Sequence, residues 1–273
     1  MIPLRPRRVD RANNNTPILS NREIDEYAHA VLADYKPRLL REPGIVNYEH
    51  FLESYCELRV MHHDIYSDDE EQPILAITAF KDIQIQIFDR ESECIRDIVV
   101  PARSVVLNNI IAEPPDMKPV ARFSGVHEGG HSLMQWHVFT GETIDGEPFD
   151  PDYKWDDIYP AVCCRREHIE SKTYIKRDKR TAEEWREHHA DYFGGAVTMP
   201  NATFIPYIRR LLRDNGYYKG FITMGRDDDL DILAHDLLPD AINETYGVSK
   251  QAARIKLRTS GFVRGTISLY QGL

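Results

Sequence analysis

Apolar positions near the start of the chain recur with a helical period. They lie three or four residues apart on one helix face, at Ile24, Tyr27, Ala28, Val31, Leu32 and Tyr35. Ser20 and Glu23 stand just before the first of them, three residues apart, which is the spacing of a capping box. We therefore predict an amphipathic helix that begins after Ser20 and ends before Pro37. A second short helix is predicted over residues 48–55.

The period changes to that of β-strands between residues 58 and 108. Segments that alternate or run apolar over strand length are LRVMHHDI (58–65), ILAITAF (74–80), IQIQIF (83–88), IRDIVVP (95–101) and SVVLN (104–108). Consecutive short strands of this kind predict a small, mostly antiparallel sheet.

A helical pattern returns near Val120, after the proline-rich break EPPDMKP. Residues 141–180 are polar, charged and irregular, which is typical of a long loop or insertion. Thr181 and Glu184 then form a second capping box, and the helix that follows ends before Pro200.

Composition and charge are those of an ordinary globular protein. The chain has 273 residues, of which 42% are hydrophobic and 29% charged, and its formal net charge is −10. That charge argues against a surface that wraps nucleic acid. No apolar run reaches the length of a membrane span. Residues 1–19 are basic without an apolar core, which predicts a disordered lead-in rather than a secretory signal.

The four cysteines do not form a recognisable framework. They are Cys56, Cys94, Cys163 and Cys164, and none stands in Cys-x-x-Cys spacing. We interpret them as reduced thiols of a cytoplasmic protein. The adjacent pair makes a poor disulfide and is expected to have no chemical role.

The segment His127-Glu128-Gly129-Gly130-His131 matches the HExxH pattern. Residues four apart share a helix face, so both imidazoles can reach one zinc ion. Glu128 can then take the proton of an attacking water molecule. The alternative is a surface helix with two solvated histidines. The paired glycines weaken it, because they cost a helix about 1–2 kcal/mol in propensity and leave room for another element or a substrate.

A catalytic zinc site needs a third protein ligand, and the sequence offers two candidates. His137, six residues after His131, has the outer spacing of the metzincin motif, but Met134 replaces the glycine at which that motif turns. In a continuous helix His137 faces away from the metal. The other candidate is Glu187, which lies one helical turn before Asp191 in the second motif helix.

We favour Glu187 as the ligand, with Asp191 as acceptor of an N–H from a ligand histidine. Two carboxylates on one helix are by themselves more often part of a solvated face than of a metal site. Their occurrence in the same chain as HExxH favours the metal site. A tetrahedral oxyanion also needs a hydrogen-bond donor. His189, Tyr192 and His137 are the candidates for that role, and His188 and His189 are also reserve candidates as ligands.

The segments RFSGVHEGGHSL (122–133) and EEWREHHADYFGGAVTMP (183–200) resemble the two motifs of the ImmA/IrrE family of metallo-endopeptidases. The second motif matches at Glu187, Ala190, Asp191, Phe193, Met199 and Pro200. Gly194 and the Val197-Thr198 pair depart from the usual residues, and no departure touches a proposed ligand. The segments VVPARSVVLNN, CCRR and GVSKQAARIKL are also similar, so the resemblance covers roughly residues 20–263.

This resemblance implies a zincin-like fold with His127, His131 and Glu187 as ligands of one catalytic zinc ion. It implies that Glu128 is the general base and that Asp191 supports a ligand. Bacterial cytoplasmic residence and selective cleavage of a protein are also implied. The typical substrate is a transcriptional repressor of a mobile element or a stress response. The two motifs here lie far apart for a compact member, since 187 − 131 = 56 residues separate the ligands.

Two further expectations concern the substrate. The insertion at 141–180 either covers the cleft and selects the substrate or is a solvated loop without a role. The strand with Val105, Val106 and Leu107 is expected at the edge of the sheet, where an extended peptide can add as a further strand. The alternative is an ordinary strand paired on both sides.

The C-terminal region predicts a helix over residues 204–213, then a helix, a turn at Gly247 and a helix from Ser249, which resembles a helix-turn-helix unit. From Val248 onward there is no acidic residue, and the basic ones are Lys250, Arg254, Lys256, Arg258 and Arg264. The alternative function is therefore a DNA- or protein-binding regulator whose metal site is structural or sensory. Acidic residues upstream would repel a duplex, which favours a subdomain that packs on the peptidase.

Together these patterns predict an α+β, zincin-like metalloprotease with an active-site helix and a C-terminal helix-turn-helix-like subdomain. We divide the chain into a lead-in at 1–19, a peptidase domain at 20–204 and a helical subdomain at 205–273.

Overall fold

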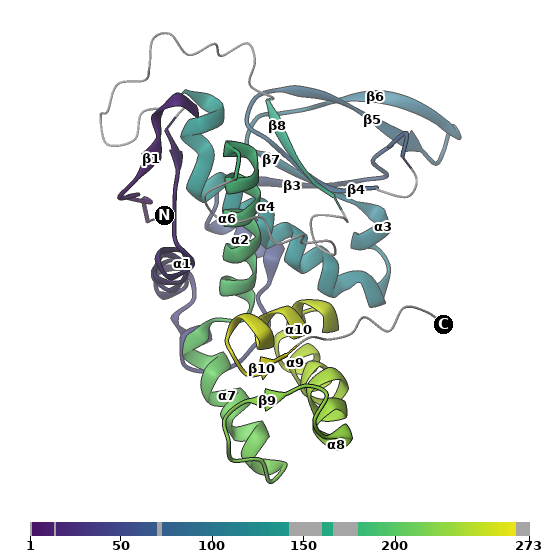
Figure 1. Cartoon of the computed structure of the whole chain (residues 1–273). Helices are drawn as coiled ribbons and strands as arrows, with labels where there is room; N and C mark the ends of the chain where they lie inside the picture. Colours follow the sequence, from purple (N-terminus) through teal and green to yellow (C-terminus); the bar gives the residue numbers. More distant parts are fainter. Residues whose placement is uncertain (1, 14, 70–72, 142–159, 166–179, 266–273) are drawn as a thin grey trace.

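The computed structural model describes residues 2–13, 15–69, 73–141, 160–165 and 180–265. Its architecture is α+β, as predicted. A four-stranded sheet lies at one end, long helices cross beneath it, and a group of short helices forms the other end (Figure 1).

The first two helices form where the apolar spacing places them. α1 (Asn21–Tyr35) starts with the complete capping box, in which the Ser20 hydroxyl accepts from the Glu23 amide and the Glu23 carboxylate accepts from the Ser20 amide. α2 (Tyr48–Ser54) is capped by the Asn47 side chain. Local capping chemistry therefore sets both helix starts; the cap of α1 was predicted from the sequence and that of α2 was not.

The segment before α1 is not the disordered lead-in that its composition predicts. β1 (Val9–Asp10) and β2 (Thr16–Pro17) pair in antiparallel orientation. Thr16 and Leu19 are buried, and Leu19 belongs to the main core. The reason is tertiary, because this segment packs on α4 and α6, which are over 100 residues away in sequence.

The main sheet has the strand order β3 (Arg59–His63), β7 (Ser104–Asn108), β4 (Ile74–Ala79) and β8 (Ala161–Arg165). β4 is antiparallel to both of its neighbours, while β3 and β7 run parallel, so the sheet is mixed. β5 (Ile83–Asp89) and β6 (Cys94–Val100) form a separate antiparallel hairpin.

The expectation that Val105–Leu107 line an edge strand is wrong. β7 pairs with β3 on one side and with β4 on the other, so its backbone groups are already engaged. All five β7 residues are buried. Burial on both faces is typical of a central strand, and SVVLN lacks the polar alternation of an edge.

β8 lies inside the segment 141–180, which was predicted to be a loop. Residues Ala161–Arg165 instead form an outer strand of the sheet, paired with β4. The rest of the predicted loop, at 142–159 and 166–179, lies outside the described residues. The expectation that this loop covers the cleft or selects substrate therefore stays a prediction.

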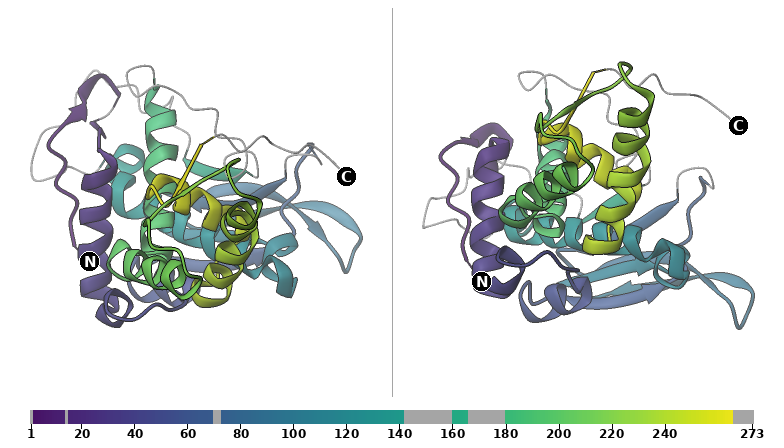
Figure 2. Two further views of the ribbon diagram at one scale, coloured as in Figure 1. Left: turned by 60° about the horizontal axis from the view of Figure 1, so that its bottom comes forward. Right: turned by 90° about the horizontal axis from the view of Figure 1, so that it is seen from below.

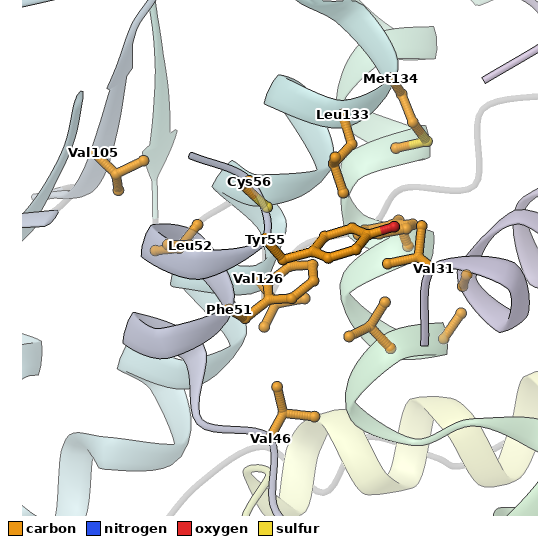
Figure 3. Packing of buried hydrophobic residues seen from close by; sticks show 14 of the residues in the cluster. Val31, Val46, Phe51, Leu52, Tyr55, Cys56, Val105, Val126, Leu133 and Met134 are labelled. Atoms are coloured by element: carbon orange, nitrogen blue, oxygen red, sulfur yellow. The ribbon is translucent and has the colours of Figure 1, made fainter. Parts of the chain in front are cut away.

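The central helix of the molecule is α4 (Lys118–Thr140), which follows the short α3 (Asn109–Ala112). It packs against α2, β4 and α6 (Ala182–Thr198). Figure 3 shows Val126, Leu133 and Met134 of this helix facing apolar side chains of α2 and α1. The α6 start carries the predicted capping box of Thr181 and Glu184.

The two glycines of the HEGGH segment allow this packing. A Cβ on Gly129 would lie 3.0 Å from a ring carbon of Phe51 on α2, and one on Gly130 would lie 3.3 Å from Cα of Ala190 on α6. The close approach that the sequence predicts is therefore made by two helices, one on each side of α4.

The C-terminal helices have a core of their own. They are α7 (Asn201–Asp214), α8 (Asp228–Ile232), a π-helical segment Leu233–Leu237, α9 (Leu238–Tyr246) and α10 (Lys250–Thr259), with a short pair of β9 (Ile222–Thr223) and β10 (Val263–Arg264). The predicted turn at Gly247 has a φ of 64°, which suits glycine. The second core begins at Met199, so the predicted boundary at residue 204 falls inside α7. Figure 2, in which the lower end of Figure 1 is turned toward the reader, shows these helices grouped in front of the rest of the molecule.

Candidate metal centre

Three side chains from α4 and α6 converge in the core. Nε2 of His127 lies 3.0 Å from Nε2 of His131. One oxygen of Glu187 lies 3.5 Å from His127 Nε2, and the other lies 3.3 Å from His131 Nε2. Both imidazoles are fully buried, whereas the Glu187 side chain is 18% exposed. The structure therefore brings together the three residues that were predicted to share one ion.

Each histidine is oriented through its other ring nitrogen. His127 Nδ1 lies 3.0 Å from Oδ1 of Asp191, as expected of that carboxylate. His131 Nδ1 lies 2.7 Å from Oε1 of Gln135, and the Gln135 amide donates to the Arg186 carbonyl. Since both partners of Nδ1 are oxygen acceptors, Nδ1 carries hydrogen and Nε2 points into the centre. Sequence reasoning missed Gln135, although its position four residues after His131 was a local signal.

Charge in the centre is unevenly distributed. Burial would lower the pKa of His127, but its hydrogen bonds with Asp191 and Glu187 raise it to about 10. Burial opposes ionisation of Glu187, yet the neighbouring His131 and His127 hold its pKa well below the usual range. A buried carboxylate thus faces two nitrogens of which one holds a proton, and a cation can replace that proton.

These three donors could hold a divalent metal ion. Two Nε2 atoms and a carboxylate are the ligands of one common class of catalytic zinc site. In that class the ligand histidines also donate Nδ1–H to oxygen, as they do here. The close approach of the two Nε2 atoms needs a proton or a metal ion between them.

Glu128 lies beside the ligand set, between α4 and the sheet. It is completely buried, and its Oε2 accepts a short hydrogen bond from the Thr78 hydroxyl of β4. Its Oε1 has no hydrogen-bond partner among the described residues. Burial raises the pKa of this carboxyl, while the nearby histidines and Thr78 act in the opposite direction. Thr78 was not identified from the sequence, because nothing local links a strand threonine to this carboxylate.

Cys164 on β8 is also part of this neighbourhood. Its Sγ, a ring nitrogen of His127 and a carboxylate oxygen of Glu128 all lie within 4.8 Å of one another. Burial, and then the charge of Glu128, raises the pKa of this thiol well above its usual value. β8 carries Cys164 into the core, and the expectation that this thiol has no chemical role stays a prediction.

The three predicted oxyanion donors make contacts elsewhere. His137 Nε2 lies 3.2 Å from the Asn15 carbonyl oxygen, and the Tyr192 hydroxyl donates to Asp25. His189 Nε2 accepts from the Leu19 amide, at 3.2 Å. His137 is likewise outside the ligand groups found in the described part of the chain. Its position agrees with a helix that continues past His131 and turns this side chain away.

Comparison of the chain with protein-family models, with curated proteins and with solved structures gives no match. Within the described residues, no helix combines the length and the apolar character that crossing a membrane requires.

Proposed function

We propose that this protein is a zinc-dependent endopeptidase with a zincin-like fold. The observation that carries the proposal is the convergence of His127, His131 and Glu187 beside the buried Glu128. A surface helix with solvated histidines, the alternative reading of HExxH, does not agree with two imidazoles at 0% exposure.

The roles of the side chains follow from their contacts. His127, His131 and Glu187 hold the ion, while Asp191 and Gln135 orient the two imidazoles. When bound, zinc lowers the pKa of a water molecule and polarises the scissile carbonyl.

Glu128 moves the proton. Thr78 holds its Oε2, which leaves Oε1 to accept a proton from the attacking water and to deliver it to the leaving amine. Burial raises the pKa of the Glu128 carboxyl. A carboxyl whose pKa lies nearer to neutrality can both accept and release the proton.

The resemblance to the ImmA/IrrE family extends the proposal to the substrate. We infer a protein substrate, a transcriptional repressor of a mobile element or a stress response, in the bacterial cytoplasm. β8 replaces β7 as the strand to which an extended peptide can add. In the described part of the chain β8 has β4 as a partner on one side only.

The contacts of the C-terminal cations support a packed subdomain over a DNA-binding one. Lys250 pairs with Asp240 at 2.6 Å, and Arg254 donates to the His235 carbonyl. Lys256 is buried, and the Arg264 guanidinium lies 3.8 Å from the centre of the Phe221 ring. These four cations are engaged within the subdomain, whereas Arg258 is exposed, so little of the charge is left for phosphates. Retention of the purified protein on unrelated duplex DNA at ~150 mM salt would contradict this conclusion.

The test combines metal analysis with cleavage of a repressor. The wild type, Glu128→Ala and Glu187→Ala are each co-expressed with the repressor encoded nearest to the gene for this protein. We expect wild type and Glu128→Ala to hold about one zinc per chain, Glu187→Ala to lose it, and only wild type to cut the repressor.

His188→Ala is the matched control. His188 is adjacent to Glu187, but its Nε2 lies 3.0 Å from the Asn21 side chain, away from the ligand set. It should keep both zinc and cleavage. Retention of zinc by Glu187→Ala would place the third ligand elsewhere. Loss of repressor activity without any cleavage product would favour the regulatory function.

A further inference from the structure

A small pocket lies on the surface of the C-terminal helices, outside the metal centre. Its volume is about 250 Å³, and its walls come from α7, from the turn that leads into β9 and from the segment that joins α10 to β10. These segments contribute to the second core, at the end of the molecule away from the main sheet (Figure 1). The pocket is therefore built by three stretches of chain that only the fold brings together.

Three cationic side chains line this pocket, and its described lining contains no acidic one. The cations are Arg209 on α7, Lys219 in the turn and Arg264 on β10. The chain has 44 acidic residues against 34 lysines and arginines, so cations have an excess of possible partners. The exposed Arg38, for example, pairs with Glu42. Among the described residues, however, the side chains of Arg209 and Lys219 form no hydrogen bond or ion pair, which leaves their charge for a ligand.

The fold holds the third cation, Arg264, in place. β10 pairs with β9, and the Met224 amide donates to the Arg264 carbonyl at 2.9 Å. Cζ of Arg264 lies 3.8 Å from the centre of the Phe221 ring, and the Tyr217 hydroxyl donates to the Phe221 carbonyl at 2.9 Å. Stacking on a ring uses the face of a guanidinium, so its N–H donors at the edge stay available. A donor that is already ordered costs less entropy when a ligand binds.

The rest of the lining adds apolar surface and a hydroxyl. Ile205 and Phe262 belong to the second core and its surroundings, and Ser260 has a hydroxyl that can donate a hydrogen bond. Arginine and lysine side chains are the groups by which proteins hold phosphate. A volume of about 250 Å³ lies below the range of about 300–1,000 Å³ that is usual for drug-sized ligands. The pocket therefore suits a compact anion with few additional atoms.

We propose that this pocket binds a phosphate group, free or carried by a small molecule, between Arg209, Lys219 and Arg264. A DNA duplex is a different kind of ligand, because its phosphates repeat along each strand, whereas these cations meet at one pocket. The acidic first turn of α8, with Asp228 and Asp229, lies outside the pocket lining and would repel an extended polyanion. The pocket shares no residue with the metal centre, so the proposal is independent of the peptidase function.

Isothermal titration of the full-length protein with inorganic phosphate and with phenyl phosphate, at ~150 mM salt, tests the proposal. We expect saturable binding at one site per chain, with phenyl phosphate bound more tightly because its ring can contact the apolar lining. Arg209→Gln and Lys219→Gln should each weaken binding about 10-fold or more, since each removes a charged donor to the phosphate. Both side chains are exposed, so neither substitution disturbs the core.

Arg210→Gln is the matched control. Arg210 is the next residue of α7 and is also exposed, but its guanidinium lies over the Tyr207 ring and outside the pocket. The substitution changes the net charge by the same amount as Arg209→Gln, and we expect it to bind both probes like the wild type. Equal weakening in these two variants would indicate general attraction of anions and would overturn the site.

The two probes also identify the source of the phosphate group. Tighter binding of phenyl phosphate supports a small phosphate ester as the ligand, and equal or tighter binding of inorganic phosphate supports the free ion. Wild-type protein without saturable binding of either probe overturns the proposal, and this result needs no variant. Binding that Arg209→Gln and Lys219→Gln both leave unchanged would place the anion elsewhere, for example at the metal centre, and also overturns it.

Discussion

The hydroxyl of Thr78 on β4 donates a hydrogen bond to Oε2 of Glu128 on α4. This contact joins the sheet to the helix that carries the HExxH residues, and both side chains are completely buried. It leaves Glu128 with one oxygen held and the other without a partner in the described part of the chain. The sheet thus provides a hydrogen-bond donor to Glu128 in addition to its part of the apolar core.

Replacing Thr78 by valine should raise the pKa of Glu128 further, because a donor to the charged form is removed. A hydrogen bond to a charged group contributes about 1.5–3 kcal/mol, which corresponds to about 1–2 pH units. The acidic limb of the pH–activity profile should therefore move to higher pH, with zinc content unchanged. Thr78→Ser keeps the hydroxyl and should keep the wild-type profile. An acidic limb that does not move in Thr78→Val would show that Glu128 is not the base.

The Asp191→Asn variant tests the orientation of His127. The neutral amide no longer stabilises the Nδ1–H tautomer by charge, and we expect zinc affinity to fall about 10–100-fold. Competition with a metallochromic chelator measures the change. Asp25→Asn is the control. Asp25 lies on α1 and accepts a hydrogen bond from Tyr192, which is on α6 like Asp191 but outside the ligand set. Equal zinc affinities in the two variants would contradict a supporting role for Asp191.

Two glycine-to-alanine substitutions should act in opposite directions. A Cβ at Gly130 would lie 3.1 Å from Phe193 and 3.3 Å from the backbone of Ala190, so α4 and α6 must separate. We expect a loss of about 1–3 kcal/mol in the free energy of unfolding and weaker zinc binding, because Glu187 moves with α6.

Gly195 on α6 provides the comparison, since beyond the adjoining helix backbone no described atom would lie within 4 Å of a Cβ there. Gly195→Ala should increase the free energy of unfolding by about 0.5–1 kcal/mol through helix propensity. Chemical denaturation measures both changes. A stable Gly130→Ala variant with normal zinc binding would mean that the helices do not need their close contact.

Zinc affinity should rise with pH through the neutral range. The pKa of His127 is raised to about 10 in the metal-free protein, above the ordinary 6.5. The stability that this proton brings is fully present below about pH 6.5 and is lost as the pH rises through about 10. Zinc must displace the proton, so affinity should increase about tenfold per pH unit below that value.

The measurement is isothermal titration of the metal-free protein with zinc between about pH 6 and pH 8, in buffers of different ionisation enthalpy. About one proton released per zinc is expected. An affinity that is independent of pH would contradict the protonated state of His127.

The features that the sequence alone determined are those with local causes. The spacing of His127 and His131 follows from the period of one helix, and the starts of α1 and α6 follow from capping boxes at Ser20 and Thr181. The turn at Gly247 follows from the conformational freedom of glycine. Each depends on residues that are close neighbours in the sequence, within about one helical turn of one another.

The tertiary structure alone decided what lies opposite these residues. Thr78 and Cys164 reach the centre because β4 and β8 pair beside α4, and β7 is central because β3 and β4 take its two edges. The N-terminal segment is likewise buried because it packs on distant helices. Strand order and burial depend on pairings between distant segments, and these are selected by how the whole core packs. The residue pattern of one segment therefore does not specify which strands will pair with it.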